Sequence, residues 1–464
     1  MKASFKILLC SIFFVAFVAN AQKVTQLKNN PATPKVTRIL FILDASGSMQ
    51  DKFDGRTRME AAKDILSRLV DSLKTVPNLE LALRVYGHQF DKILNNCKDT
   101  KLEVPFKPGN HDAIKIKIKT ITPKGTTLIA NSLLHSTSDF PDDKNSRNVI
   151  ILITDGIESC GGDPCALSVA LQKKRIFLKP FIIGVGADEN FAKAFSCMGQ
   201  YFDANDSKTF KASLNKILTQ TLKETTVVIN LLDFFDNPTE TNVNITFVNS
   251  VTEEVMYDYV HYKNSKGKSD KVKIDAILSY DIVVNTIPKV VKKDIAFEGG
   301  IENTVNIKTP QGILMLREHY KEYKQLPAII KENNKSETLN IQHCGTKEKY
   351  LVGNYDIEVL TLPRTIFKDI KIEQSKTTTL NIEPPGILSI TDQAQGFGSL
   401  YMIKEKGEHE WIYNFQDENS RASLPMQPGN YKFVFRSQKT MGSEYTIVQY
   451  FTIYPGKTTN LKIF

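Results

Sequence analysis

Between residues 36 and 224, short apolar runs alternate with amphipathic stretches. Residues 36–43 end in the unbroken apolar run ILFIL, which is typical of a strand buried on both faces of a sheet. Apolar residues from Met59 to Leu73 then recur at helical spacing, and Pro77 ends that helix. This alternation predicts a doubly wound, mostly parallel, Rossmann-like α/β sheet over residues 36–224.

The same alternation predicts the remaining strands and helices of this domain. Open sheets of this kind bind ligands at the carboxyl ends of their strands, so the segments that follow the strands are the first places to look for chemistry. We expect further strands at residues 79–87, 102–106 (at an edge), 148–154, 177–185 and 201–204, and helices at residues 127–140 and 207–222.

After residue 224 the pattern changes to short alternating β-type segments that repeat. YDIVVNTIP from Tyr280 returns as YDIEVLTLP from Tyr355 and more weakly as YKFVFRSQ from Tyr431, and GILML from Gly312 returns as GILSI from Gly386. Repeats of this length suit small β-sandwiches of the immunoglobulin-like or prealbumin-like kind. We expect three tandem β modules, at residues 225–310, 311–384 and 385–464.

The N-terminal residues have the order of a secretory signal. Lys2 and Lys6 precede an apolar run at residues 7–18, and small residues follow up to Ala21, which predicts a signal peptide over residues 1–21. No later segment has the roughly 18 uninterrupted apolar residues of a membrane helix. We therefore expect export without a membrane helix, to the periplasm, the outer surface or the medium, with association with the cell envelope left open.

Composition narrows the classes of partner. The formal net charge is +9, from 60 Lys and Arg against 51 Asp and Glu, and the cationic residues are scattered among the acidic ones. Nucleic acid is not indicated, because no arginine-rich stripe is present.

Five cysteines remain once the signal peptide is removed. Cys160 and Cys165 enclose glycines and a proline that permit a tight turn, so we expect them to form a local disulfide, with Cys97 and Cys197 as the residual pair. An odd number leaves at least one thiol unpaired, and the state of Cys344 stays open.

Three separated segments supply oxygen-bearing side chains where strands end or a helix begins. Asp44, Ser46 and Ser48 follow the first strand, Thr127 opens a helix, and Asp155 closes a strand. Small hard cations prefer oxygen ligands and accept outside groups where the protein supplies too few. The two carboxylates and three hydroxyls therefore predict a site for a divalent cation.

The motifs DASGSM, PKGTTLIANSL and LITDG together look like the metal-ion-dependent adhesion site of von Willebrand factor type A domains. The resemblance spans residues 36–224 and is closest to secreted bacterial members that carry RVYGH, a following cysteine and ESCGGDPC. It implies a divalent metal, Mg²⁺ with Mn²⁺ or Ca²⁺ as alternatives, held by the five residues named above, and a partner protein that supplies an Asp or Glu carboxylate. Thr127 is aligned in preference to Thr126 because GTTLIANSL then fits G-x-T-P-I-A-x-S-L, although Leu128 replaces the proline.

The same residues also permit other interpretations. Serines and an aspartate before a helix also suit an N-terminal turn, and His88 either lines the metal face or, as we favour, closes its strand through a hydrogen bond. A metal-assisted hydrolase is the alternative function, but the chain has no H-E-x-x-H or G-x-S-x-G motif, so we expect no enzyme. A third interpretation makes the repeats carbohydrate or envelope binders with a regulatory first domain.

Overall fold

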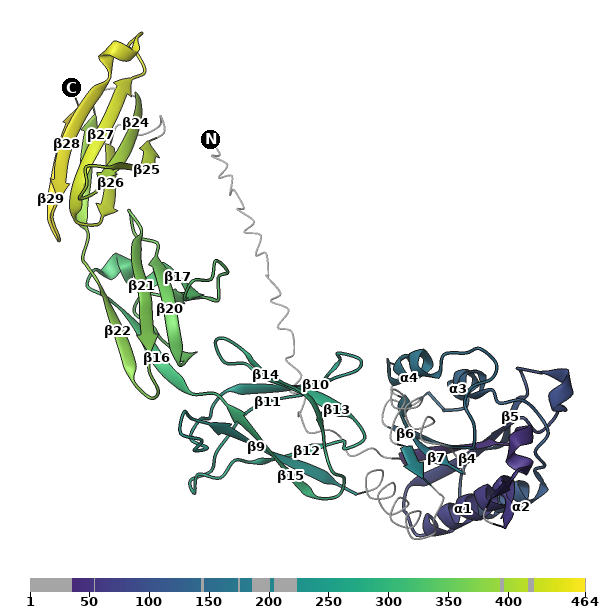
Figure 1. Ribbon diagram of the computed structural model, residues 1–464. Coiled ribbons are helices and arrows are strands. Elements are labelled where there is room, and N and C mark those ends of the chain that lie inside the picture. The colour runs from purple at the N-terminus through teal and green to yellow at the C-terminus, as the bar shows by residue number, and fades with distance from the viewer. Residues whose placement is uncertain are drawn as a thin grey trace, which may run out of the picture.

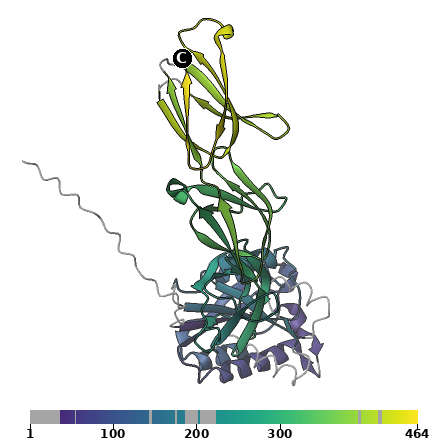
Figure 2. The same ribbon diagram turned by 90° about the vertical axis from the view of Figure 1, so that its left-hand side faces the viewer.

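The computed structural model describes residues 36–53, 55–142, 146–173, 176–185, 201–203, 223–392, 396–415 and 421–463. An α/β domain is followed by three β modules in a row, which we call the stalk, and Figures 1 and 2 show the stalk leading away from the α/β domain. The expected signal peptide at residues 1–21 and the expected helix at residues 207–222 lie outside the described residues.

The α/β domain is built on one six-stranded sheet with the order β5-β4-β1-β6-β7-β8. All neighbours pair in parallel except β5, which runs antiparallel to β4 at the edge. A mostly parallel, doubly wound α/β sheet is thus confirmed. Its strands are β1 (Val36–Asp44), β4 (Leu79–Tyr86), β5 (Thr100–Pro108), β6 (Ser146–Thr154), β7 (Ile176–Gly184) and β8 (Tyr201–Asp203). A small hairpin of β2 (Lys52–Phe53) and β3 (Arg56–Thr57) precedes the first helix.

Helices cover both faces of this sheet (Figure 1). Successive side chains of a strand point to opposite faces, so Phe41 packs with one pair of helices and Leu40 with the other, and both are fully buried. This two-sided burial explains why β1 is apolar without alternation. The helices are α1 (Arg58–Ser72) and α2 (His111–Thr120) on one face, and α3 (Ile129–Ser136) and α4 (Pro164–Lys173) on the other.

Two of these helices were not predicted from the sequence, and a third is shorter than predicted. α2 and α4 were not anticipated, and α3 begins at Ile129, not at residue 127. The later start has a local cause, because Gly125 pairs with Ser46 in a parallel bridge and its carbonyl accepts a hydrogen bond from the backbone N–H of Gly47 (2.8 Å). Because the chain is extended at this point, α3 begins only after Leu128.

Among the described residues, each stalk module has seven strands in two sheets. The first module is β9 (Thr225–Leu232), β10 (Asn244–Asn249), β11 (Val255–Val260), β12 (Lys271–Ile274), β13 (Ser279–Val284), β14 (Val290–Ala296) and β15 (Glu302–Lys308). The second is β16 (Gln311–Glu318), β17 (Pro327–Glu332), β18 (Asn340–His343), β19 (Lys347–Leu351), β20 (Gly353–Val359), β21 (Thr365–Ile372) and β22 (Thr377–Ile382). The third is β23 (Gly386–Asp392), β24 (Gly396–Ile403), β25 (His409–Phe415), β26 (Arg421–Met426), β27 (Gly429–Ser437), β28 (Ile447–Ile453) and β29 (Thr458–Ile463).

The strand order is the same in all three modules. In the first, β12-β9-β15 form one sheet and β11-β10-β13-β14 form the other, with β9 and β15 parallel. With the strands lettered A to G, the sheets are DAG and CBEF, whereas constant-type immunoglobulin domains have ABED and CFG. The modules are therefore β-sandwiches, but not of the immunoglobulin arrangement.

The repeated motifs have the same structural role in each module. The tyrosine of each YDIVV-type segment is buried and donates its hydroxyl hydrogen bond to a carbonyl a few residues upstream: Tyr280 to Asp275 (2.8 Å), Tyr355 to Leu351 (2.8 Å) and Tyr431 to Gln427 (2.7 Å). The weak third copy thus keeps this contact.

The glycine that opens each GIL segment is required by a close approach. A Cβ on Gly312 would lie 2.2 Å from the carbonyl oxygen of Glu373, and a Cβ on Gly386 would lie 2.4 Å from that of Tyr454. A side chain cannot be accommodated against backbone at such distances. The repeat therefore preserves, in the second and third modules, the packing of the first strand against the turn before the last strand.

Adjacent domains are joined by specific contacts. Arg147, at the start of β6, forms an ion pair with Asp275 of the first module, and Ile277 of that module is buried in the same apolar cluster as α1. The first module thus contacts the α/β domain at the end of the sheet where the parallel strand β6 begins. Between modules, the backbone N–H of Leu351 donates to the carbonyl of Ile287 (2.7 Å), and the backbone N–H of Gln427 donates to the carbonyl of Leu362 (2.7 Å).

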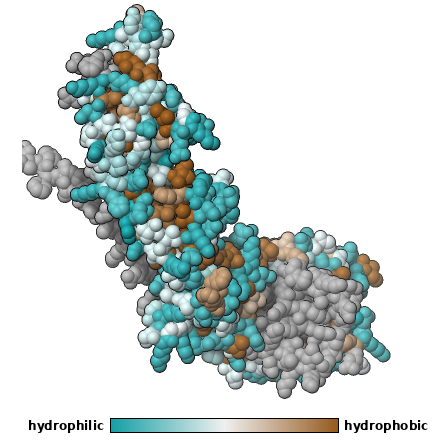
Figure 3. Space-filling model, turned by 60° about the vertical axis from the view of Figure 1, so that its left-hand side comes forward, coloured by the Kyte–Doolittle hydropathy of each residue, from teal (hydrophilic) through white to brown (hydrophobic). Residues whose placement is uncertain are grey.

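The stalk surface is mixed in character. On the face shown in Figure 3, hydrophobic residues form separate groups at several levels of the stalk with hydrophilic side chains between them. Within the residues that the structure describes, no helix has the length and apolar character needed to cross a membrane.

One buried ion pair inside the α/β domain yields a stability prediction. Arg84 is 5% exposed and donates two hydrogen bonds of 2.7 Å to the Asp139 carboxylate. Asp139→Ala leaves the guanidinium buried without its counter-ion, so we expect the free energy of unfolding of this domain to fall by about 3–5 kcal/mol in urea denaturation. Asp142→Ala, which removes an exposed carboxylate three residues further on, is the matched control and should change little. Equal stability of the two variants would contradict this account of Arg84.

Candidate metal site at the carboxyl edge of the sheet

The first segment of the site is the turn after β1. Asp44 is completely buried, and its Oδ1 accepts a hydrogen bond from the backbone N–H of Ser46 (2.7 Å). This bond turns the chain into a short 3₁₀ helix, η1 (Gly47–Gln50). The carboxylate of Asp44 and the hydroxyls of Ser46 and Ser48 are thereby brought to one end of β1.

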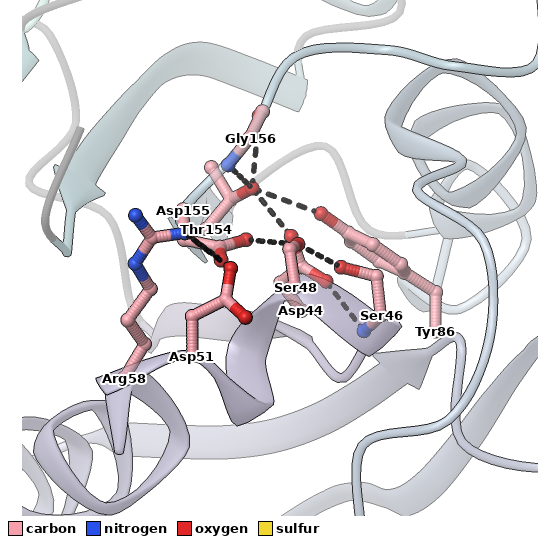
Figure 4. A network of polar contacts seen from close by, with 9 residues as sticks. All are labelled: Asp44, Ser46, Ser48, Asp51, Arg58, Tyr86, Thr154, Asp155 and Gly156. Atoms are coloured by element: carbon pink, nitrogen blue, oxygen red, sulfur yellow. Dashed lines mark hydrogen bonds and ion pairs between the residues drawn. The ribbon is translucent and has the colours of Figure 1, made fainter. Parts of the chain in front are cut away.

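Ser48 connects this turn to a second segment. The Oγ atoms of Ser46 and Ser48 are 3.1 Å apart, and the Ser48 hydroxyl donates to Asp155 Oδ1 (3.0 Å) across 107 residues of sequence. Asp155 directly follows β6, the parallel neighbour of β1. Figure 4 shows Asp44, Ser46, Ser48 and Asp155 directed toward one another.

Thr127 belongs to the third segment and lies near Gly156, the residue after Asp155. A Cβ placed on Gly156 would be 3.9 Å from Thr127 Oγ1, so the threonine hydroxyl faces the backbone after Asp155. The neighbouring Thr126 Oγ1 is buried without a hydrogen-bond partner among the described residues. Both hydroxyls therefore lie near the site, and Thr127 is the one that faces the aspartate segment.

A buried polar network that includes Thr154 and Tyr86 supports Asp44 (Figure 4). The Thr154 hydroxyl donates to Asp44 Oδ2 (2.6 Å), and the Tyr86 hydroxyl donates to Thr154 Oγ1 (3.2 Å). Burial, followed by the charge of Asp44, raises the pKa of Tyr86 well above its usual value, so the phenol stays a donor. The network fixes the orientation of the Asp44 carboxylate.

The two carboxylates are poorly compensated in charge. The side chain of Asp155 is 0% exposed, and burial together with the nearby charge of Asp44 raises its pKa to about 6. Arg58, at the start of α1, donates to Asp155 Oδ2 (3.0 Å) and opposes this rise only in part. A divalent cation held at this site would supply the missing positive charge.

These residues fit a hard divalent cation. The donors that converge are oxygens only, from carboxylates and hydroxyls, and Asp155 presents Oδ1 to Ser48 while Arg58 holds Oδ2. Such a set suits Mg²⁺, Mn²⁺ or Ca²⁺ better than a softer ion. In this arrangement Asp44, Ser46, Ser48, Thr127 and Asp155 would hold the ion, which would act as a Lewis acid toward an outside oxygen ligand.

A cleft of about 260 Å³ opens onto the serine and threonine hydroxyls. Its floor is tightly packed, because a Cβ on Gly125 would lie 2.9 Å from both Gly87 Cα and the Phe90 carbonyl oxygen. The cleft is lined by Ser46, Gly47, Ser48, Lys92, Asn95, Gly125, Thr126, Thr127 and Ser159.

The disulfide prediction is wrong. Cys160 pairs with Cys97, with Cα atoms 5.7 Å apart, and not with Cys165. Because Cys97 is bonded to Cys160, the expected Cys97–Cys197 pairing is excluded as well, and Cys197 itself lies outside the described residues. Cys165 is also disulfide-bonded. Cys344 is a buried free thiol, and burial raises its pKa to about 11.

The reason for the different pairing is the way the segment after Asp155 folds. The Glu158 carboxylate accepts hydrogen bonds from the backbone N–H groups of Ala130 (2.6 Å) and Cys160 (2.8 Å). These bonds hold the segment against the start of α3, where the Asn131 side chain also donates to the Cys97 carbonyl (2.9 Å). Cys160 is therefore positioned beside Cys97, while Cys165 lies in the first turn of α4.

His88 closes its strand, as favoured from the sequence. Its Nε2 is hydrogen-bonded to Glu103 Oε1 (3.0 Å) on the neighbouring strand β5. Burial alone would raise the pKa of Glu103, but hydrogen bonds from Lys117 and His88 lower it to about 2. His88 is thus engaged in the sheet and does not line the cleft.

The fold and the site together define a class: doubly wound α/β domains with a cluster of hydroxyls and carboxylates at the carboxyl edge of the sheet. The sequence profile of the von Willebrand factor type A domain matches residues 39–158. The chain is 30% identical over 190 residues to YwmD of Bacillus subtilis (strain 168), covering 39% of this chain and 84% of that protein. It is 26% identical over 230 residues to YwmC of the same organism, covering 47% of this chain and 97% of that protein.

Among solved structures, BatB from Bacteroides thetaiotaomicron is 22% identical, with 39% of this chain and 97% of that chain covered and a TM-score of 0.31.

The sequence profile and the match to YwmD show that the chain belongs to the von Willebrand factor type A domain family. Domains of this family commonly bind a divalent metal and mediate protein interactions, generally without catalysis.

Proposed function

We propose that this protein is an exported, metal-ion-dependent protein-binding protein. Its α/β domain holds Mg²⁺, or alternatively Mn²⁺ or Ca²⁺, through Asp44, Ser46, Ser48, Thr127 and Asp155, and the ion binds an Asp or Glu carboxylate of a partner. The observation that carries this proposal is the convergence of the serine hydroxyls with Asp155 above the buried Asp44.

The position of the site in the molecule supports a binding role. The stalk contacts Arg147 at the start of β6, whereas Asp155 follows the end of that strand. A nine-residue strand is about 26 Å long, so the site lies on the side of the domain remote from the stalk. A partner can therefore approach it without meeting the β modules.

The Cys97–Cys160 disulfide supports the exported location. Such bonds form and persist in oxidising compartments and are rare in the cytosol. The signal peptide expected at residues 1–21 agrees with this, and the periplasm, the outer surface and the medium all meet the requirement.

Capture of a partner in the presence and absence of a chelator tests the proposal. The immobilised full chain should retain a protein from envelope extract in Mg²⁺ and release it in EDTA, because the carboxylate is bound through the ion. Retention unchanged by EDTA would contradict a metal-mediated contact. Cleavage of the captured protein in Mg²⁺ would instead indicate the metal-assisted hydrolase.

A further inference from the structure

The segment between β4 and β5, residues 88–99, forms one side of the metal cleft and is held firmly in place. Both oxygens of the buried Asp99 carboxylate accept backbone hydrogen bonds from Gln89, and one accepts from Phe90 (3.0 Å). The backbone N–H of Lys92 donates to the Lys124 carbonyl (2.9 Å). With the disulfide from Cys97, these contacts fix the segment at its start, middle and end.

This fixed segment exposes two large aliphatic side chains. Ile93 is 91% exposed and Leu94 is 65% exposed, and they lie in a 3₁₀ turn, η2 (Lys92–Leu94), directly between Lys92 and Asn95, which line the cleft. The anchoring contacts are all made by other residues, so neither side chain is needed to hold the segment. Apolar side chains exposed beside a polar site are typical of a binding surface.

A second segment that borders the cleft carries a third exposed aliphatic residue. Ile157 is 58% exposed and follows Asp155 and Gly156, and Ser159 two residues later lines the cleft. The Cys97–Cys160 bond joins this segment to the segment that carries Ile93 and Leu94. Exposed apolar side chains therefore lie in both of the disulfide-linked segments that border the hydroxyl cluster.

The exposed charge at the cleft favours an acidic ligand. Asp44 and the side chain of Asp155 are fully buried, so their charges do not face solvent. Lys92 lines the cleft, and its Cδ is 3.5 Å from the position of a Cβ on Gly47. An ammonium group at the edge of the cleft, together with a bound cation, attracts a carboxylate.

We infer that the occupant of this surface is an extended peptide segment of a partner protein in which an acidic residue is flanked by bulky aliphatic residues. This inference rests on the proposed function and specifies its partner. The carboxylate binds at the metal, and the flanking side chains pack on Ile93 and Leu94 on one side and on Ile157 on the other. The disulfide holds the two apolar sides in register with the metal.

Three synthetic peptides test this recognition with the full chain in Mg²⁺: Gly-Leu-Asp-Leu-Gly, Gly-Gly-Asp-Gly-Gly, and Gly-Leu-Asn-Leu-Gly, all blocked at both ends. Affinities are measured by isothermal titration calorimetry, with direct Mg²⁺ titration as a separate readout. We expect the Leu-flanked aspartate peptide to bind roughly tenfold more tightly than the Gly-flanked one, because its leucines bury apolar surface. The asparagine peptide should not bind, and EDTA should abolish binding of the other two.

The variant I93S/L94S should remove the tenfold preference and keep the binding of the Gly-flanked aspartate peptide and of Mg²⁺. I116S, which alters another exposed isoleucine on α2 (67% exposed), is the matched control and should keep the preference.

Equal affinity of the two aspartate peptides for the wild type would overturn this inference and leave the proposed function intact. Failure of both to bind although Mg²⁺ binds would overturn the carboxylate capture itself. A wild-type dimer that I93S/L94S dissociates, seen by sedimentation, would also overturn the inference, because a second copy would then cover these side chains.

Discussion

Asp44→Asn is expected to weaken Mg²⁺ binding by more than about 100-fold, since even residues that only support metal ligands typically contribute 10- to 100-fold. Asparagine keeps the shape of the side chain and can still accept the hydrogen bond from Ser46, but it removes one of two buried negative charges. Mg²⁺ should therefore raise the unfolding temperature of the wild type and leave that of D44N unchanged, as measured by scanning calorimetry.

The same variant yields a second readout without metal. Asp44 and Asp155 repel each other, as the raised pKa of Asp155 indicates. Metal-free D44N should consequently be at least as stable as the metal-free wild type, which separates lost binding from lost folding. Asp51→Asn, which alters an exposed carboxylate near the same site, is the control and should bind Mg²⁺ normally. Full Mg²⁺ stabilisation of D44N would exclude Asp44 as a ligand.

Loss of the Cys97–Cys160 disulfide has the second large effect. The bond closes a loop with a sequence separation of 63 residues, for which loop-closure entropy predicts about 4 kcal/mol of stabilisation. The double variant C97S/C160S should lower the free energy of unfolding of the α/β domain by about that amount in urea, with both cysteines replaced to prevent mispairing with Cys165 or its partner.

The variant should also weaken the peptide preference, because the two sides of the cleft are no longer tied together. C344S, which alters a thiol in the second β module, is the control and should leave the α/β domain unchanged. If C97S/C160S unfolds at the same urea concentration as the wild type, the bond does not constrain this domain.

Local sequence was sufficient to predict the central part of the fold and the turn that groups three of the candidate site residues. The ILFIL run predicts a doubly buried strand because both faces of β1 are covered, and Asp44, Ser46 and Ser48 come together because one tight turn holds them. In the stalk, repeated tyrosine and glycine positions identified the modules because each copy needs the same buried contact.

Features that depend on contacts between residues far apart in the chain could not be predicted from local sequence. α2 was missed because Ile114, Ile116 and Ile118 alternate with lysines at the period of a strand, although Ile116 is exposed on a helix. The Arg58 contact with Asp155 spans 97 residues, and nothing in the first turn of α1 signals it. The disulfide pairing depends on Glu158 capping α3, a contact that cysteine spacing does not encode. Thr154 lies within the LITDG motif, but its bond to Asp44 requires the register of β1 and β6.

The most direct test of the metal site is anomalous X-ray scattering from crystals of the full chain soaked in MnCl₂. A cation held by Asp44, Ser46, Ser48, Thr127 and Asp155 predicts one strong manganese peak at coordination distance from these oxygens, and no such peak in D44N crystals treated alike. Absence of a peak there at saturating Mn²⁺, with the five side chains in the positions described, would contradict the metal site and the carboxylate capture that depends on it.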